Sequence, residues 1–369
     1  MKLEDLGEIA LRDYRPVRYF PFQNEAGSAF ILTSEPFNYL EAFLESELNS
    51  VKRDSSKKKK ENLSKAIYFT KLSQDFFNSS LTANMPSKGT LLYYSFINLV
   101  KVYLIKNEYN LEKKLEHHGL TLPPDSKDVL KLIKNGDDGI SIFHEFAKTL
   151  GKEIVNDTGS TIKFQELLRD LPEIHEICYA LDLFPLTKRK FLPVDINIRT
   201  NANHNKIYYT LSYEKKFDKL MKTEKLSKGI FKELLDRQDI IDDTRCHHFK
   251  STLILRYTNK SDISWKRCYP KLIDNINKLG ISPMITRGGY RFYLDLESSR
   301  FHRLSSILGF AFYLGTVGRY RPTLNEDILK GRYQSAINEA IVSCPHQFFY
   351  LLVSYITKQV CAVPMAKIS

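Results

Sequence analysis

The sequence predicts an α+β fold that is mainly α, in which both ends of the chain form a helical body around a mixed, β-containing insertion. Apolar residues recur at helical spacing through most of residues 1–185 and again over 299–369. Between 186 and 298, several stretches alternate apolar and polar residues, which is typical of half-buried strands. A chain of 369 residues with 43% hydrophobic residues can bury a sizeable core without disulfides or a metal.

The N-terminal part is expected to be a series of helices. Residues 38–48 and 66–77 have helical spacing, and the clearest pattern places Leu92, Phe96, Leu99, Val100, Tyr103 and Leu104 on one face. His117-His118-Gly119 follows this helix, and the glycine is expected to cap a helix end. Further helices are expected at 126–134, 139–150 and 164–182, the last with Asp170 as its cap and Pro172 in its first turn.

The insertion is expected to begin with a β-hairpin. In FLPVDINIRTN, residues 191–201, Val194, Ile196 and Ile198 share one face, and IYYTLSYE supplies the partner strand. Helical spacing returns over 215–237, and residues 249–257 and 284–296 alternate again. Gly288-Gly289 is expected to form a turn in the latter stretch.

The C-terminal part is expected to contain helices at 300–317, 324–342 and 345–361. Ser343 and Pro345 suit the cap and first turn of the last helix. The longest apolar stretch, 304–317, is shorter than the roughly 20 residues that a membrane span needs. It therefore predicts a buried helix and no membrane partner.

The N-terminus and the cysteines favour a cytoplasmic protein. Glu4, Asp5 and Glu8 lie where a secretory signal would have its basic and apolar regions. The five cysteines are odd in number and include no C-x-x-C pair, so reduced thiols are expected.

The excess positive charge is concentrated in the insertion. Residues 186–271 hold 20 Lys and Arg against 10 Asp and Glu, within a chain of net charge +12. One interpretation is a surface that grips phosphates and stacks bases on aromatic rings; the other is that the aromatic residues form core while the basic residues only solvate the outside. The candidate residues for binding nucleic acid or another partner are Lys188, Arg189, Lys190, Arg199, Lys250, Arg256, Lys266 and Arg267.

Motifs for catalysis are weak. The R-x(4–6)-H spacing of HEPN ribonucleases occurs at Arg169…His175 and Arg199…His204, but about one such match is expected by chance in this composition. Cys246, His247, His248 and Cys268 point in different directions along strands, so no metal site is expected. A metal-dependent nuclease would need a carboxylate pair and a lysine, and the spacing of Asp195, Asp295, Glu297 and Lys250 does not single them out. Phosphate loops and a nucleophile elbow are missing from the sequence, and no cofactor is expected.

Polar residues at the ends of two apolar helices are the remaining candidates. His118 follows the first helix, and Arg319 and Arg321 follow the second. Such groups often cap helix carbonyls. Alternatively, they converge on a polar pocket, in which His118 and Arg319 are the catalytic candidates.

At these clusters the sequence resembles the YaaC-like family of bacterial proteins. The resemblance rests on residues 91–105 with 116–120, on FQELLRDLPEIHEI at 164–177, and on LSSILGFAFYLGTVGRYRP at 304–322. It covers the helical ends and not the β-containing middle. It implies a cytosolic bacterial protein but no reaction. The matching residues are Asn98, Lys101, His118, Gly119, Arg319 and Tyr320.

Two functions follow as hypotheses. The first is an accessory or binding module that engages nucleic acid or a protein partner through the basic insertion, in phage defence or DNA processing. The alternative is a nuclease, either HEPN-type or metal-dependent, with its site near the ends of the central helices. A third hypothesis is a subunit, for example of a homo-oligomer, in which another chain covers the apolar helix at 345–361; the alternative is that this helix belongs to the core.

Overall fold

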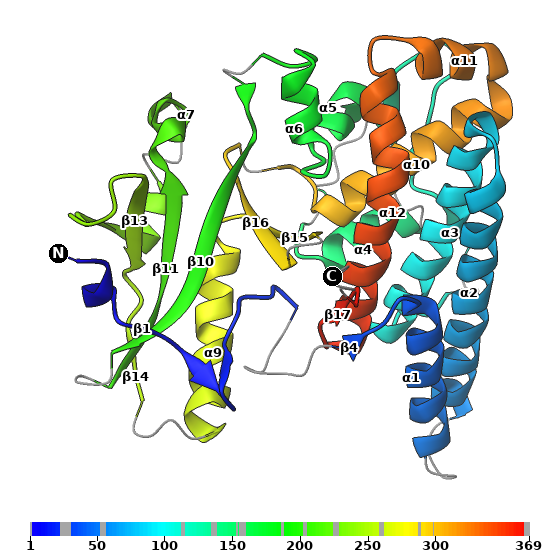
Figure 1. Ribbon diagram of the computed structural model, residues 1–369. Helices are drawn as coiled ribbons and strands as arrows, with labels where there is room; N and C mark the ends of the chain where they lie inside the picture. The colour runs from blue at the N-terminus through cyan, green and yellow to red at the C-terminus, as the bar shows by residue number, and fades with distance from the viewer. Residues whose placement is uncertain are drawn as a thin grey trace, which may run out of the picture. The chain divides into compact units, whose positions relative to one another are not determined.

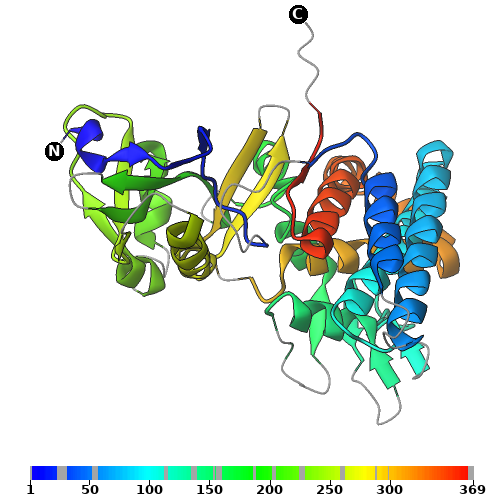
Figure 2. The same ribbon diagram turned by 90° about the horizontal axis from the view of Figure 1, so that it is seen from below.

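The computed structural model describes residues 2–22, 31–51, 57–111, 115–133, 139–152, 154, 160–185, 188–201, 205–223, 229–257, 262–286, 289–297 and 299–364. The chain forms two compact units (Figures 1 and 2). The sheet unit comprises residues 1–31, 184–298 and 358–369, and the helical unit comprises 32–183 and 299–357. Helices outweigh strands, which confirms the α+β, mainly α prediction. The first 31 residues belong to the sheet unit, although the sequence pattern had grouped them with the helices.

The helical unit is built around α3 (Met85–Lys106), which packs against α2 (Lys57–Thr82), α10 (Arg303–Tyr320) and α12 (Gln334–Thr357). Helix α1 (Pro36–Ser50) lies beside α2 and α12 in both ribbon views. Most of α3 and nearly all of α10 are buried, because their apolar residues cover more than one face. The predicted buried helix at 304–317 is therefore confirmed.

Glycines let α3 and α10 approach closely. A Cβ on Gly89 would lie 2.8 Å from Leu314 Cβ, and one on Gly315 would lie 3.1 Å from Tyr93 Cβ. Thr90 Oγ1 also donates to the Gly315 carbonyl at 3.3 Å, so the contact holds a hydrogen bond between the helices. This close approach brings Tyr93 and Tyr94 next to the last turns of α10.

Small elements complete the helical unit. Strands β5 (Leu115–His117) and β8 (Gly139–Ser141) pair in parallel, while β6 (Leu120–Thr121), β7 (Val129–Leu132) and β9 (Thr161–Lys163) form an antiparallel sheet. The short helices are α4 (Ile142–Thr149), α5 (Phe164–Arg169), α6 (His175–Ala180) and α11 (Pro322–Lys330).

Four local predictions in this unit are wrong. Residues 126–134 contain strand β7, because Leu130 and Leu132 are buried on one face and Lys131 is exposed between them. The segment 164–182 forms two helices, with Asp170 at the end of the first and Pro172 between them. Pro345 lies inside α12, where buried residues on both sides sustain the helix. Gly119 lies between strands with φ of +80°, and does not cap a helix.

The sheet unit is built on an eight-stranded antiparallel sheet. Its order is β12 (Leu235–Gln238), β13 (Cys246–Ser251), β11 (Lys206–Glu214), β10 (Phe191–Asn201), β16 (Gly289–Asp295) and β15 (Ile281–Thr286). Strand β1 (Glu8–Ile9) adds to β10, and β14 (Leu255–Arg256) adds to β11. The predicted hairpin is confirmed, since Asp195 pairs with Ser212 and Asn201 with Lys206. The expected turn at Gly288-Gly289 falls partly outside the described residues.

Shorter segments surround this sheet. They are η1 (Leu3–Leu6), β2 (Leu11–Arg12), β3 (Arg15–Pro16), η4 (Lys215–Phe217), α7 (Asp218–Thr223) and α8 (Ile230–Leu234). Strand β17 (Cys361–Ala362) pairs with β4 (Ile31–Leu32). The helical spacing at 215–237 thus gives short helices and a strand, not one long helix.

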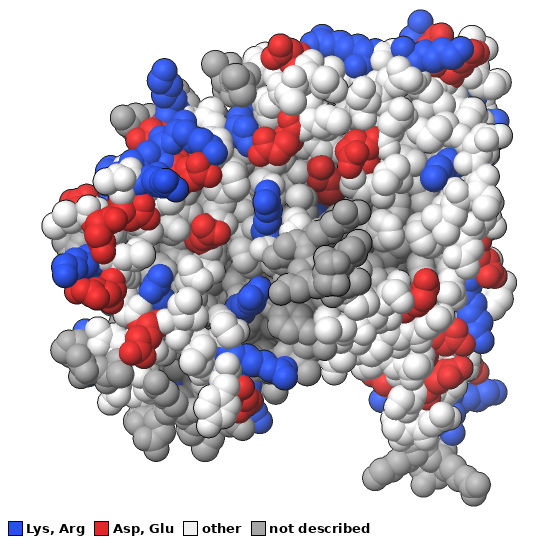
Figure 3. Space-filling model, viewed as in Figure 1, with Lys and Arg blue, Asp and Glu red and all other residues white. Residues whose placement is uncertain are grey.

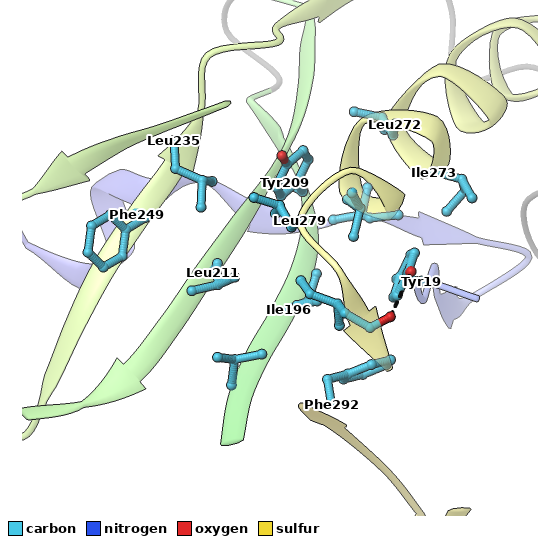
Figure 4. Packing of buried hydrophobic residues seen from close by; sticks show 14 of the residues in the cluster. Tyr19, Ile196, Tyr209, Leu211, Leu235, Phe249, Leu272, Ile273, Leu279 and Phe292 are labelled. Atoms are coloured by element: carbon cyan, nitrogen blue, oxygen red, sulfur yellow. Dashed lines mark hydrogen bonds between the residues drawn. The ribbon is translucent and has the colours of Figure 1, made fainter. Parts of the chain in front are cut away.

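Helix α9 (Asp262–Asn277) covers one face of the sheet. Its buried residues recur at i, i+3, i+4, i+7, i+8 and i+11 and form one apolar stripe: Trp265, Cys268, Tyr269, Leu272, Ile273 and Ile276. This stripe joins the core with Ile196, Tyr209 and Leu211 of the sheet (Figure 4). Tyr19 completes the core and donates to Asn277 Oδ1 at 2.7 Å. The sequence prediction did not include this helix.

The aromatic residues of the basic region are core residues. Every one of them is at most 9% exposed: Tyr208, Tyr209, Tyr213, Phe249, Tyr257 and Trp265. The interpretation in which these rings stack on bases is therefore wrong, and any anionic ligand must be held through charges and hydrogen bonds.

Candidate functional site

The family-like residues of the helical unit gather where α3 meets the end of α10. His118 is exposed, and its Nδ1 lies 2.6 Å from the hydroxyl of buried Tyr93. Arg319 donates to the Tyr94 hydroxyl and to the Gly315 carbonyl. Its guanidinium also lies 5.1 Å from the centre of the Tyr94 ring. Two consecutive tyrosines of α3 thus hold the histidine and the arginine.

The Tyr93 contact determines the chemistry available to His118. Burial raises the pKa of Tyr93 well above its usual value, so the phenol stays protonated. Among the described residues the Tyr93 hydroxyl has no acceptor other than His118 Nδ1, so it donates there. Partial burial of the ring, together with the charges of Arg319 and Lys101, lowers the pKa of His118. The neutral ring therefore carries its proton on Nε2 and presents a hydrogen-bond donor.

The other family-like residues have contacts that support the fold. Lys101 forms a 2.7 Å ion pair with Glu116, and Asn98 Nδ2 donates to the Tyr94 carbonyl at 2.7 Å. Gly119 is required because a Cβ there would lie 1.9 Å from Ser141 Oγ. Tyr320 is 71% exposed.

Arg321 has a structural role, but it binds carbonyls of a neighbouring loop and not those of a helix end. It donates to the carbonyls of Leu122, Pro123 and Ser126. It therefore does not converge with His118 on a common polar pocket.

Residues 171–173, the Leu-Pro-Glu sequence within the family-like stretch 164–177, have a structural role through Glu173. The Glu173 carboxylate is 1% exposed and pairs at 2.6 Å with Arg303 of α10, whose side chain is 5% exposed. Arg303 also donates to Gln347 Oε1 of α12 at 3.0 Å. One buried cation thus connects the loop before α6 with two core helices.

Neither ribonuclease spacing forms a helical Arg–His site among the described residues. Arg169 ends α5 and His175 begins α6, so they do not share one helix face. His175 is buried, and its Nδ1 lies 2.7 Å from the Pro172 carbonyl. Arg199 lies in β10, and His204 lies outside the described residues.

In the cluster of Cys246, His247, His248 and Cys268, both histidines are paired with aspartates. His247 Nε2 lies 2.8 Å from Asp218, and His248 Nε2 lies 2.8 Å from Asp243. The pairing with His248 and backbone hydrogen bonds lower the pKa of Asp243 to about 2. Within the described residues no group of three His, Cys, Asp or Glu side chains is placed to hold a metal ion.

Four of the eight basic candidates have internal roles. Arg189 and Lys190 are 7% and 5% exposed, and Arg189 packs its guanidinium on the Phe217 ring at 5.0 Å. Arg199 donates to the Gly7 carbonyl and to Thr210 Oγ1. Lys250 lies 4.1 Å from the centre of the Tyr208 ring. Lys188, Arg256, Lys266 and Arg267 are exposed.

Two of the exposed candidates meet in an open pocket of about 620 Å³ between β14 and α9. Arg256 comes from β14 and Arg267 from α9, and Lys271, one turn further along α9, lies beside them. Asn205, Leu255, Tyr257 and Cys268 complete the lining. The three cations form no ion pair with a described carboxylate. Lys271 was missed because α9 was missed; its i+4 spacing from Arg267 was the available signal.

The net charge belongs almost wholly to the sheet unit. This unit holds 29 Lys and Arg against 18 Asp and Glu, a net charge of +11 out of +12. On the face shown in Figure 3, however, basic and acidic side chains alternate over this unit and do not form one continuous basic field. On this face, therefore, net charge alone does not define a binding surface.

Comparison with models of protein families shows to which family the chain is related. The sequence model of the YaaC-like protein family matches residues 30–356. The chain belongs to the YaaC-like family. The YaaC-like match includes the β-containing middle, so the expectation that the resemblance is limited to the helical ends is wrong. No curated protein and no solved structure matches the chain significantly.

One described helix is long and apolar enough to cross a membrane by length and composition alone. This is α12, of which 78% of the most apolar window is buried inside the protein. Such burial is consistent with the core helix of a soluble protein.

Proposed function

We propose that this YaaC-like protein is a binding module whose sheet unit holds the phosphate groups of a nucleic acid. The observation that carries the proposal is the convergence of Arg256, Arg267 and Lys271 on one open pocket without a described carboxylate partner. Phosphate groups are the anions that clustered Arg and Lys side chains bind best. DNA processing and phage defence are settings in which such a module would act.

The charge distribution supports this proposal over a protein partner. The sheet unit has a net charge of +11, which favours attraction of a polyanion from a distance. Its aromatic residues are buried, so affinity is expected to come from phosphate contacts and to be largely independent of base sequence.

The experiment is a salt titration of DNA binding by fluorescence anisotropy. Three phosphate contacts predict that log Kd rises with log salt concentration with a slope of about 2.7 for a duplex. The variant with Arg267→Glu and Lys271→Glu should lose most of the binding. Lys278→Glu, which removes an exposed charge outside the pocket, is the matched control. A binding curve that does not change with salt would refute the proposal.

Reversal of Lys188, Arg189 and Lys190 together is a poor test. Arg189 and Lys190 are buried, so glutamates there would unfold the sheet unit whether or not it binds DNA. The pocket variants avoid this problem because Arg256, Arg267 and Lys271 are exposed.

The nuclease hypothesis makes a different prediction. If His118 and Arg319 were catalytic, His118→Ala would abolish cleavage of a nucleic acid and leave the melting temperature nearly unchanged. The contacts favour binding instead, because the free lone pair of neutral His118 is engaged by Tyr93 and no base faces outward. Cleavage by the wild-type protein that disappears in His118→Ala would establish the enzyme.

A further inference from the structure

We propose that the pocket between β14 and α9 recognises a terminal phosphate monoester at the end of a nucleic-acid strand. This inference rests on the proposed function and specifies which part of the nucleic acid enters the pocket. It is argued from the number of charges in the pocket, from one unpartnered hydroxyl and from the pocket's shape.

The charges in the pocket match a dianion better than a monoanion. Arg256, Arg267 and Lys271 supply three positive charges, and no described carboxylate lines the pocket. A backbone phosphodiester carries one negative charge, whereas a phosphate monoester carries about 1.5 to 2 at neutral pH.

The Tyr257 hydroxyl gives an independent indication of a missing acceptor. Tyr257 is 8% exposed and lines the pocket, and its buried hydroxyl has no hydrogen-bond partner among the described residues. Burial and the charge of Glu8 raise the pKa of this phenol, so it remains a donor. Buried hydroxyl groups without an acceptor are uncommon, and a terminal phosphate oxygen would supply one.

The arrangement around the pocket fixes two of its donors. Arg267 donates to the Arg256 carbonyl at 2.8 Å, and the Tyr257 amide donates to the Asn205 carbonyl at 3.0 Å. These bonds tie α9, β14 and the residue before β11 to one another. The volume of about 620 Å³ exceeds the size of a phosphate group, and the apolar lining from Leu255 and Tyr257 can accommodate the attached sugar.

The test compares three short single-stranded DNAs of one sequence, with a 5′-phosphate, a 3′-phosphate or hydroxyl groups at both ends. Binding of each to the full chain is measured by anisotropy at one salt concentration. The wild-type protein should bind both phosphorylated strands about tenfold more tightly than the hydroxyl strand, because additional charged hydrogen bonds form. Lys271→Gln should reduce this preference to near one, whereas Lys278→Gln should retain it.

Tyr257→Phe is the most specific variant. It removes only a hydroxyl that has no described partner, so the melting temperature should stay the same or rise. The preference for phosphorylated strands should fall severalfold. An unchanged preference in Tyr257→Phe and Lys271→Gln would overturn the assignment of this pocket.

The outcomes separate the inference from the proposed function. If all three strands bind equally and in a salt-dependent way, the sheet unit binds DNA but the end recognition is refuted. If none binds, the proposed function is refuted as well. If AMP or inorganic phosphate binds with sensitivity to Lys271→Gln while no strand binds, the pocket serves a free phosphate compound, and recognition of a strand end is refuted.

Discussion

Removal of the Glu173 carboxylate should destabilise the helical unit strongly. Glu173→Ala leaves the Arg303 guanidinium buried without a counter-charge, since the two side chains are 1% and 5% exposed. Breaking a buried ion pair by removing one partner costs about 3–5 kcal/mol. For a unit of this size, that corresponds to a fall in melting temperature of about 6–20 °C.

The assay is thermal unfolding followed by far-UV circular dichroism, which is dominated by the helices. Glu326→Ala is the matched control, because Glu326 pairs with Lys330 on the surface of α11 and both side chains are more than 60% exposed. The control should not move the transition measurably, since exposed pairs contribute little.

A double variant distinguishes the lost ion pair from a simple packing defect. Glu173→Leu with Arg303→Met removes both charges and keeps apolar volume, so it should recover much of the stability lost in Glu173→Ala. A loss below about 1 kcal/mol in Glu173→Ala, or a double variant as unstable as the sum of its single changes, would refute the reasoning.

Two further predictions concern local structure. Burial, with the charges of Arg303 and Lys152, lowers the pKa of His302 to about 3, so the unfolded state binds a proton that the folded state does not as pH falls below about 6.5. The contribution of His302 to the free energy of unfolding should therefore be fully present above about pH 6.5 and decline toward pH 3 by up to about 1.4 kcal/mol per pH unit. Urea unfolding measures this decline. It should be shallower in His302→Asn, which keeps a cap for the Leu304 amide. Gly119→Ala should cost more than about 1 kcal/mol in the same measurement. Gly151→Ala is its control, because Gly151 has the same φ of +80° but no atom within 4 Å of the added Cβ, and equal losses would contradict the role assigned to the contact with Ser141.

The long elements were predictable because the spacing of apolar residues within each one already shows which residues are buried. Helices α3 and α10 carry apolar residues on most faces, and β10 alternates along its length, so each pattern is visible without its partners. Strand β7 was not predictable in this way. It has four residues, and its pairing with β6 and β9 depends on contacts that local spacing does not show.

The candidate sites also depend on contacts between distant segments, which local sequence does not show. Arg256 and Arg267 were recognised from the charge of their region, but their convergence depends on where α9 lies against β14. Arg189 and Lys190 are candidates for binding a partner on the sequence alone. They are buried because Phe217 offers Arg189 an aromatic face and the Phe191 carbonyl accepts from its Nε, contacts that exist only after the sheet has formed.

Family motifs and net charge have separate physical roles in this protein. Most of the family-like polar side chains of the helical unit already have partners inside that unit: Glu116 for Lys101, Tyr93 for His118 and Tyr94 for Arg319. Satisfied groups of this kind stabilise a fold and have little remaining capacity to bind a ligand. Arg256, Arg267 and Lys271 have no carboxylate partner among the described residues, and a cation without a counter-charge is the group that gains most from an arriving phosphate. Ligand binding is therefore expected from the sheet unit, and the motifs that identify the family report mainly on how the helical unit is held together.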